Sequence, residues 1–345
     1  MTNMFATIFS RKEEIVMDTD KLRQRFPTEQ ACREFFEQIM WPAGRICPHC
    51  RSKKSISITG KTARSGLYQC STCQRQFTVT TKTSMHSTKL CLWKWILAMY
   101  YMVNSSKGVS SVFLAKWIGV SQKTAWKICH AIREMMRPAP EGKPKLSGIV
   151  ELDEKYVGGK PRYQHGVSHK PGKATKKQAV FVAVQRHGPV CSTLIAGDKT
   201  SDIEPVVKRF VEPSAHLMTD HNTAYHHIGQ RFASHSWVNH SEKEYARGNV
   251  HNNTAESYNS LLERAKLGVF HYLSKKHLQR YLHEISFRWN HRSPVIKQTA
   301  KGKEKIIMKP LPVMDMLRSV IRNASGRQLR RSKKGGFLVL NPIFT

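Results

Sequence analysis

Acidic residues are scarce in this chain of 345 residues: 24 aspartates and glutamates stand against 57 lysines and arginines, which gives a formal net charge of +33. An ordinary metabolic enzyme rarely carries such an excess, because like charges repel one another in a compact fold. A polyanionic partner relieves that repulsion, and nucleic acid is the simplest one. A basic surface that is merely solvated is the alternative.

Long hydrophobic runs are also absent. The longest, Leu90 to Val103, has 14 residues and contains Lys94, whereas a membrane span takes about 20. The apolar stretch at the N-terminus is too short for a signal peptide, and its charges follow the stretch instead of preceding it. We therefore expect no membrane partner and a cytoplasmic protein whose thiols stay reduced.

Four of the eight cysteines form two CxxC pairs with 19 residues between them. They are Cys47, Cys50, Cys70 and Cys73. Both thiolates of such a pair can reach one tetrahedral metal ion at about 2.3 Å. The spacing predicts a zinc ribbon over residues 46–82 with one structural Zn²⁺ and a strand at 76–80. A redox CxxC motif is the alternative, and His49 inside the first pair is not counted as a ligand.

Helical patterns surround the ribbon, in an N-terminal segment (residues 1–45) and a second region (residues 88–137). Within the second region, Gly119 separates two apolar stripes, and Ser121 is a good N-cap for the helix that follows. This pattern predicts a helix–turn–helix, although an ordinary corner between two helices is the alternative. The outer face of its second helix is polar and basic, as contact with a DNA major groove requires. That face consists of Gln122, Lys123, Lys127 and His130.

From about residue 146 the pattern changes from helices to strands. Alternating or wholly apolar runs predict strands at 148–157, 178–184, 191–196, 215–220 and 234–238. Helices are expected at 201–210, where Ser201 and Glu204 form a capping box, then at 222–228 and from about residue 253. The order βββαβαβα describes a ribonuclease H-like domain of the α/β class, with a mixed sheet, over residues 146–292.

Three acids occupy matching places in this element order. Asp153 lies on the first strand, Asp220 ends the fourth, and Glu256 begins the late helix. Phosphoryl transfer on nucleic acid uses two Mg²⁺ ions about 3.5–4 Å apart, and carboxylates are the ligands that Mg²⁺ prefers. We predict that the three acids are catalytic and hold two Mg²⁺, with Mn²⁺ as a substitute. Each acid alone is equally well explained as a surface, turn or capping residue.

Two further residues, His251 and Asn253, are expected near these acids, where they could position a phosphate or a water molecule.

The segments GIVELDEKYVGGK, LMTDHNTAY and HNNTAESYNSLLERAK, which follow a CPHC…CSTC ribbon, resemble the ISXO-like DDE transposases of bacterial insertion sequences. The resemblance covers roughly residues 25–292. It implies that Asp153, Asp220 and Glu256 form the DDE triad. It also implies an enzyme that binds terminal inverted repeats, releases 3′-OH ends and joins them to target DNA. Such an enzyme would act as a homo-oligomer on double-stranded DNA, associated with the bacterial nucleoid.

Two segments concentrate the basic charge. Residues 158–177 hold six basic residues and no acid, and residues 301–335 hold 11 basic and 2 acidic residues. The first group consists of Lys160, Arg162, Lys170, Lys173, Lys176 and Lys177. We expect both the loop and the basic C-terminal tail (residues 293–345) to contact DNA phosphates, with a short helix near 313–321. Solvated surface is the alternative for both.

Two other functions stay open at this stage. A DNA-binding regulator without catalysis would use only the ribbon and the helix–turn–helix. A ribonuclease H-like nuclease would cut DNA without joining it.

Overall fold

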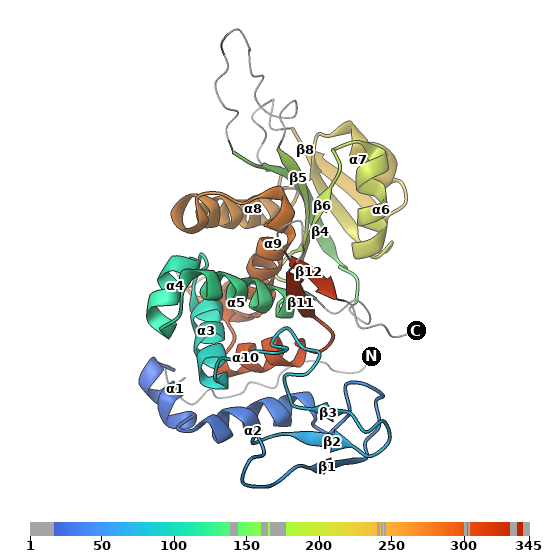
Figure 1. Ribbon diagram of the computed structural model, residues 1–345. Coiled ribbons are helices and arrows are strands. Elements are labelled where there is room, and N and C mark those ends of the chain that lie inside the picture. The colour runs from blue at the N-terminus through green and yellow to red at the C-terminus, as the bar shows by residue number, and fades with distance from the viewer. Residues whose placement is uncertain are drawn as a thin grey trace.

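The computed structural model describes residues 17–138, 144–159, 165, 177–239, 242, 244, 246–299, 302, 304–331 and 337–340. A five-stranded sheet in the order β6-β5-β4-β7-β8 organises the C-terminal half (Figure 1). Strand β5 pairs antiparallel with β4 on one side and with β6 on the other. Strand β7 pairs parallel with β4, and β8 pairs parallel with β7. The strands are β4 (Ile149–Val157), β5 (Gln178–Gln185), β6 (Val190–Ile195), β7 (His216–Asp220) and β8 (Ser234–Val238). This mixed sheet confirms the predicted ribonuclease H-like fold.

Helices cover both faces of the sheet (Figure 1). Side chains of a strand alternate between faces, and those of β4 and β5 divide accordingly into two cores. Val150 and Leu152 join the core with α6 (Thr200–Phe210) and α7 (Thr223–Gly229). On the other face, the valines of β5 pack against α8 (Asn253–Ala265) and α9 (Lys275–Asn290). Because β5 is buried on both faces, its sequence is nearly all apolar.

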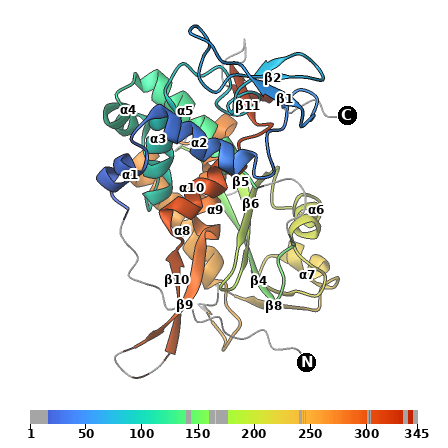
Figure 2. The ribbon, with the colours of Figure 1, turned by 90° about the horizontal axis from the view of Figure 1, so that it is seen from below.

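The N-terminal half is a helical core with the ribbon beside it (Figures 1 and 2). The helices are α1 (Thr19–Arg25), α2 (Glu29–Met40), α3 (Leu92–Asn104), α4 (Ser111–Ile118) and α5 (Gln122–Met135). The ribbon strands are β1 (Ser55–Ser57), β2 (Tyr68–Cys70) and β3 (Gln76–Phe77), so the expected strand at 76–80 is shorter than predicted. Gly119 has a φ of 62° between α4 and α5, and Ser121 caps α5, which confirms the helix–turn–helix.

Helix α5 is buried along most of its length, and here one prediction is wrong. His130 was expected on the outer face but is 0% exposed. The reason is that α9 of the other half packs against α5 at this point, with the ring of His130 4.8 Å from that of His277. Only the first turns of α5 face outward. The pattern of a single helix cannot show that it has two buried sides.

Buried ion pairs join α5 to α9. Arg133 donates to Glu284 at 2.7 Å, Arg288 donates to the same carboxylate at 2.6 Å, and Arg280 donates to Glu134 at 2.6 Å. Removing one member of a buried pair leaves an uncompensated charge, which typically costs about 3–5 kcal/mol. These pairs therefore fix the helix–turn–helix to the sheet domain.

The segment after residue 292 is not a loose tail. Strands β9 (Arg292–Gln298) and β10 (Glu304–Pro310) form a hairpin that projects from the body (Figure 2). Helix α10 (Val313–Arg322) buries its apolar face in the N-terminal helical core, against α2, α3 and α5. Strands β11 (Gln328–Arg331) and β12 (Phe337–Leu340) form a second hairpin. The short helix expected near 313–321 is thereby confirmed as α10, whereas its packing against the N-terminal helices was not predicted.

Two smaller points complete the fold. Helix α6 begins at Thr200 after Lys199, without a side-chain cap, so the predicted capping box at Ser201 is wrong. None of the helices in the described ranges is both long and apolar enough to cross a membrane.

The junction between α5 and α9 should be sensitive to acid. Burial lowers the pKa of His130 to about 2, helped by the nearby charges of Arg133, His277 and Arg280. The unfolded chain takes up a proton near pH 6.5 that the folded chain excludes, so stability falls as the pH drops below that value, by up to about 1.4 kcal/mol per pH unit. We expect H130F to lose less stability than the parent between pH 6.5 and 4.5 in urea denaturation. Equal losses in both proteins would contradict this.

Candidate functional site

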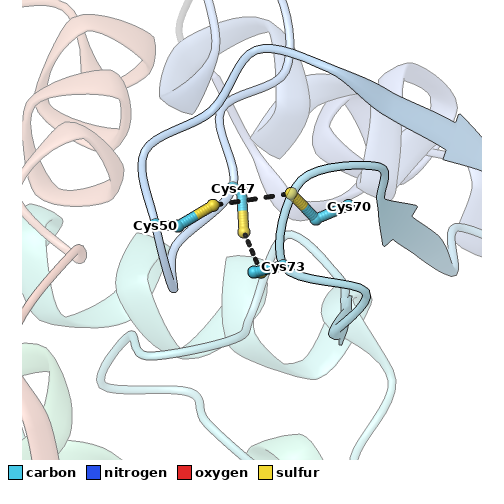
Figure 3. Close-up of side chains that lie close together, drawn as sticks. All are labelled: Cys47, Cys50, Cys70 and Cys73. Carbon is cyan, nitrogen blue, oxygen red and sulfur yellow. Dashed lines mark hydrogen bonds between the residues drawn. The ribbon is translucent and has the colours of Figure 1, made fainter.

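The four predicted cysteines come together in the ribbon (Figure 3). Among the described residues, theirs is the one group of three or more potential metal ligands whose atoms all lie within 4.8 Å of one another. The sulfurs of Cys47 and Cys73 are 3.8 Å apart, and those of Cys50 and Cys70 are 3.5 Å apart. A tetrahedral zinc ion with bonds of about 2.3 Å places its sulfurs about 3.8 Å from each other. The residues therefore fit a structural Zn²⁺.

The surroundings of Cys70 also suit a metal. Backbone N–H groups of Cys73 and Thr72 lower the pKa of Cys70 to about 6, which favours the thiolate that zinc binds, whereas burial raises the pKa of Cys47. His49 lies outside the cluster as predicted, with its Nε2 3.3 Å from the carbonyl oxygen of Gln76.

In the sheet domain, the register of two strands brings two of the predicted acids together. Glu151 of β4 pairs with Met218 of β7, and two residues further along these parallel strands come Asp153 and Asp220. Neighbouring strands lie about 4.8 Å apart, and paired residues point to the same face. That face is the one covered by α8, because Asn259 of α8 donates to Asp153 Oδ2 at 2.6 Å.

The charges of the other two predicted acids act on Asp153. Burial, together with the negative charges of Asp220 and Glu256, raises the pKa of Asp153 to about 6. Glu256 itself lies exposed in the first turn of α8. A bound cation would reduce the repulsion between these negative charges. Carboxylates from three elements are ligands that Mg²⁺ accepts. The residues fit the predicted metal, although their oxygens stand further apart than those of a closed cluster.

Glu154, next to Asp153, points to the opposite face of β4. Its carboxylate accepts a hydrogen bond from Tyr225 of α7, and burial raises its pKa to about 7. Glu154 therefore belongs to the core under α7 and not to the acid cluster.

Glu151 is the residue whose importance the sequence does not reveal. It shares the face of Asp153, is fully buried, and accepts hydrogen bonds from the backbone N–H groups of Thr254 and Ala255 at 2.6 and 3.1 Å. The Thr254 hydroxyl donates to it at 2.9 Å. The carboxylate thus caps the N-terminus of α8, where the helix dipole favours negative charge. This contact fixes the helix that carries Glu256 against the strand that carries Asp153.

Arg186 completes this clamp. It donates to Glu151 at 2.6 Å and to the carbonyl oxygens of Asn249 and His251 at 2.8 and 2.9 Å. His251 Nδ1 lies 3.4 Å from Glu151 Oε1, so His251 sits in the clamp. Asn253, the first residue of α8, is exposed. No pattern in the sequence marks Arg186, because it lies in the turn after β5.

The residues proposed for DNA contact divide into two groups. Gln122, Lys123 and Lys127 are exposed on the first turns of α5. Lys177 lies half-buried beside Gly158, near the start of β5. The remaining predicted contacts lie outside the described residues; they are Lys160, Arg162, Lys170, Lys173 and Lys176.

Comparison with known proteins identifies the family. Residues 145–290 match the ISXO2-like transposase domain, and residues 27–76 match the transposase zinc-ribbon domain. A protein of the transposable element ISH50 from Halobacterium salinarum is 30% identical over 275 residues, which cover 76% of this chain and 91% of that protein. The chain belongs to the ISXO2-like transposases. The resemblance seen in the sequence is thereby confirmed.

Solved structures add little to this assignment. The transposase aligns with the Mos1 strand transfer complex at 13% identity and a TM-score of 0.21, over 57% of this chain and 76% of that one. The mariner Mos1 paired end complex with Mg gives 14% identity and a TM-score of 0.23, over 56% and 73%. Scores this low carry no functional argument.

Zinc should hold the ribbon together. We expect the transposase to contain one equivalent of zinc by metal analysis and C70S to contain far less, because three sulfurs bind the ion more weakly than four. C129S, which alters a cysteine in the helical core, is the matched control and should keep its zinc. Equal zinc contents in C70S and the parent would refute the four-cysteine site.

Loss of the Glu151 carboxylate should loosen α8. In E151A, the Arg186 charge and two helix N–H groups lose their partner, and we expect the free energy of unfolding to fall by about 3–5 kcal/mol in urea denaturation. E151Q keeps one acceptor oxygen and should lose less. Amide exchange at Thr254 and Ala255 should speed up in both variants. Unchanged protection of these amides in E151A would contradict the clamp.

Proposed function

We propose that this transposase binds the terminal inverted repeats of its element, cleaves the DNA to free 3′-OH ends and joins these ends to target DNA. The observation that carries the proposal is the meeting of Asp153 and Asp220 on adjacent parallel strands, with Glu256 close enough to raise the pKa of Asp153. The three acids are the proposed catalytic residues and the proposed ligands of two Mg²⁺ ions.

The chain supplies the conditions for this chemistry. With a pKa of about 6, Asp153 is ionised at neutral pH and can bind a cation. Asn259 orients its carboxylate, and the Glu151 clamp sets the position of Glu256. When bound, two Mg²⁺ ions would polarise the attacking oxygen and stabilise the leaving oxygen. Hydrolysis and strand transfer are both in-line displacements at phosphorus, so one site serves both.

Recognition of the element ends is assigned to α5. A helix–turn–helix places the N-terminal residues of its second helix against base edges. The exposed part of α5 consists of these residues, with Gln122, Lys123 and Lys127 facing outward. Since the rest of α5 packs against α9, a bound DNA end would be held in a fixed relation to the acid cluster.

A strand-transfer assay tests the proposal. The purified transposase with Mg²⁺ should join a labelled element end to a plasmid, and D153N should reduce the joined product by at least about 1,000-fold, as expected for loss of a group that acts directly on the reacting atoms. D315N removes an exposed acid on α10 and should join normally.

Other results would point elsewhere. Full joining by D153N would sink the assigned triad. Cleavage without any joined product would favour a nuclease. DNA binding with neither cleavage nor joining would favour a regulator.

A further inference from the structure

A groove of about 610 Å³ runs along α8. Residues of α8 that recur every three or four positions line it, and these share one stripe of the helix. They are Asn253, Thr254, Ser257, Leu261 and Arg264. The turn between β5 and β6, with His187, forms a second wall, and Trp289, Arg292 and Met308 form the third. None of these residues belongs to the proposed triad.

Arg292 lines this groove, and contacts with Trp289 fix its position. Its guanidinium stacks on the Trp289 ring at 3.7 Å, and its Nε donates to the Trp289 carbonyl oxygen at 3.0 Å. It is half-buried, yet within the described ranges no acid pairs with it. A partly desolvated charge without a counter-ion is unfavourable, so a bound anion would stabilise it. The planar guanidinium suits a phosphate, which it can bind through two parallel hydrogen bonds.

Arg264 adds a second free guanidinium. It is exposed on α8, where its Nε donates a long hydrogen bond of 3.3 Å to the Ser260 carbonyl oxygen. Among the described residues it too has no acidic partner. Arg186 also lines the groove, but its donors are used by Glu151 and two carbonyl oxygens. The anion site therefore rests on Arg264 and Arg292.

The hairpin of β9 and β10 extends the positive charge beyond the groove. Residues 292–310 contain six basic residues and one acid. Lys305 stands directly opposite Lys297 in the register, an arrangement that destabilises a hairpin unless a partner neutralises the charges. A two-stranded hairpin is only marginally stable alone. Charge that continues from the groove along an arm suits a polymer of phosphates better than a single phosphate ion.

We propose that this groove binds the phosphate backbone of a DNA strand that passes along α8, with Arg264 and Arg292 as its phosphate ligands. The inference rests on the proposed function for the identity of the polymer, and it adds a contact surface beyond the helix–turn–helix and the acid cluster. Because the contacts are to phosphate, they position the DNA without reading its sequence.

The salt dependence of DNA binding tests the groove. DNA binding is measured by fluorescence anisotropy with two labelled duplexes, one with an element end and one of random sequence. In R264Q and in R292Q, the negative slope of log K against log salt should become shallower by about 0.9. Both duplexes should lose affinity equally. R292K keeps the charge and should keep the slope. R209Q removes an exposed arginine from α6, on the other face of the sheet, and should bind as the parent does.

Each outcome decides the matter. Unchanged slopes in both R264Q and R292Q, with the parent's thermal stability, would overturn the proposal. Binding of inorganic phosphate, seen by ³¹P NMR and lost in R292Q without any change in DNA affinity, would overturn it in favour of a small-anion site. Strand transfer by D153N tests the proposed function independently of the groove. If D153N joins DNA, the triad is wrong, and the salt slopes of R264Q and R292Q still report on the groove.

Discussion

The carboxylate of Glu151 is the constraint on which the geometry of the candidate site depends. A buried charge must find partners, and here these are the N-terminus of α8 and the guanidinium of Arg186. The same contact joins three separate parts of the chain: strand β4, the turn after β5 and the helix α8 that carries Glu256. It acts together with the apolar packing of α8 on β5 and with the hydrogen bonds from Asn252 to the Leu152 carbonyl oxygen and from Asn259 to Asp153, which also hold the helix that carries Glu256 against the sheet. The acid cluster is thus positioned by a fourth acid that is not a member of it.

A second set of buried charges fixes larger parts of the molecule to each other, because it links α5 to α9. Glu284 takes two arginines, one from α5 and one from its own helix, while Glu134 of α5 takes Arg280 of α9. Ion pairs of this kind gain little over well-packed apolar contacts, but separating the partners would leave buried charges without compensation. The helix–turn–helix and the sheet domain are consequently fixed to each other, and α10 returns from the far end of the chain to close the helical core.

Much of the fold was predictable because its signals are local. The two CxxC pairs define the ribbon, the wholly apolar run of β5 marks a strand buried on both faces, and Gly119 with Ser121 marks the turn between α4 and α5. Asp153 within β4 and Asp220 at the end of β7 follow from the same reasoning, since the strands that carry them can be placed from the pattern. His130 was misplaced because a helix with two buried sides has no single apolar stripe. The helix near 313–321 was predicted and is confirmed as α10, but the basic composition around it gave no sign that its apolar face packs in the N-terminal helical core.

The sequence by itself determined the metal-binding cysteines, the order of strands and helices and the identity of the acids, since each depends on residues close together in the chain. Only the tertiary structure decided which residues surround those acids. Glu151 meets Thr254 across 103 positions of sequence, and Arg133 meets Glu284 across 151. Contacts over such separations arise from the packing of whole elements against one another. For that reason the clamp, the junction between the two halves and the basic groove along α8 became visible only in the folded chain.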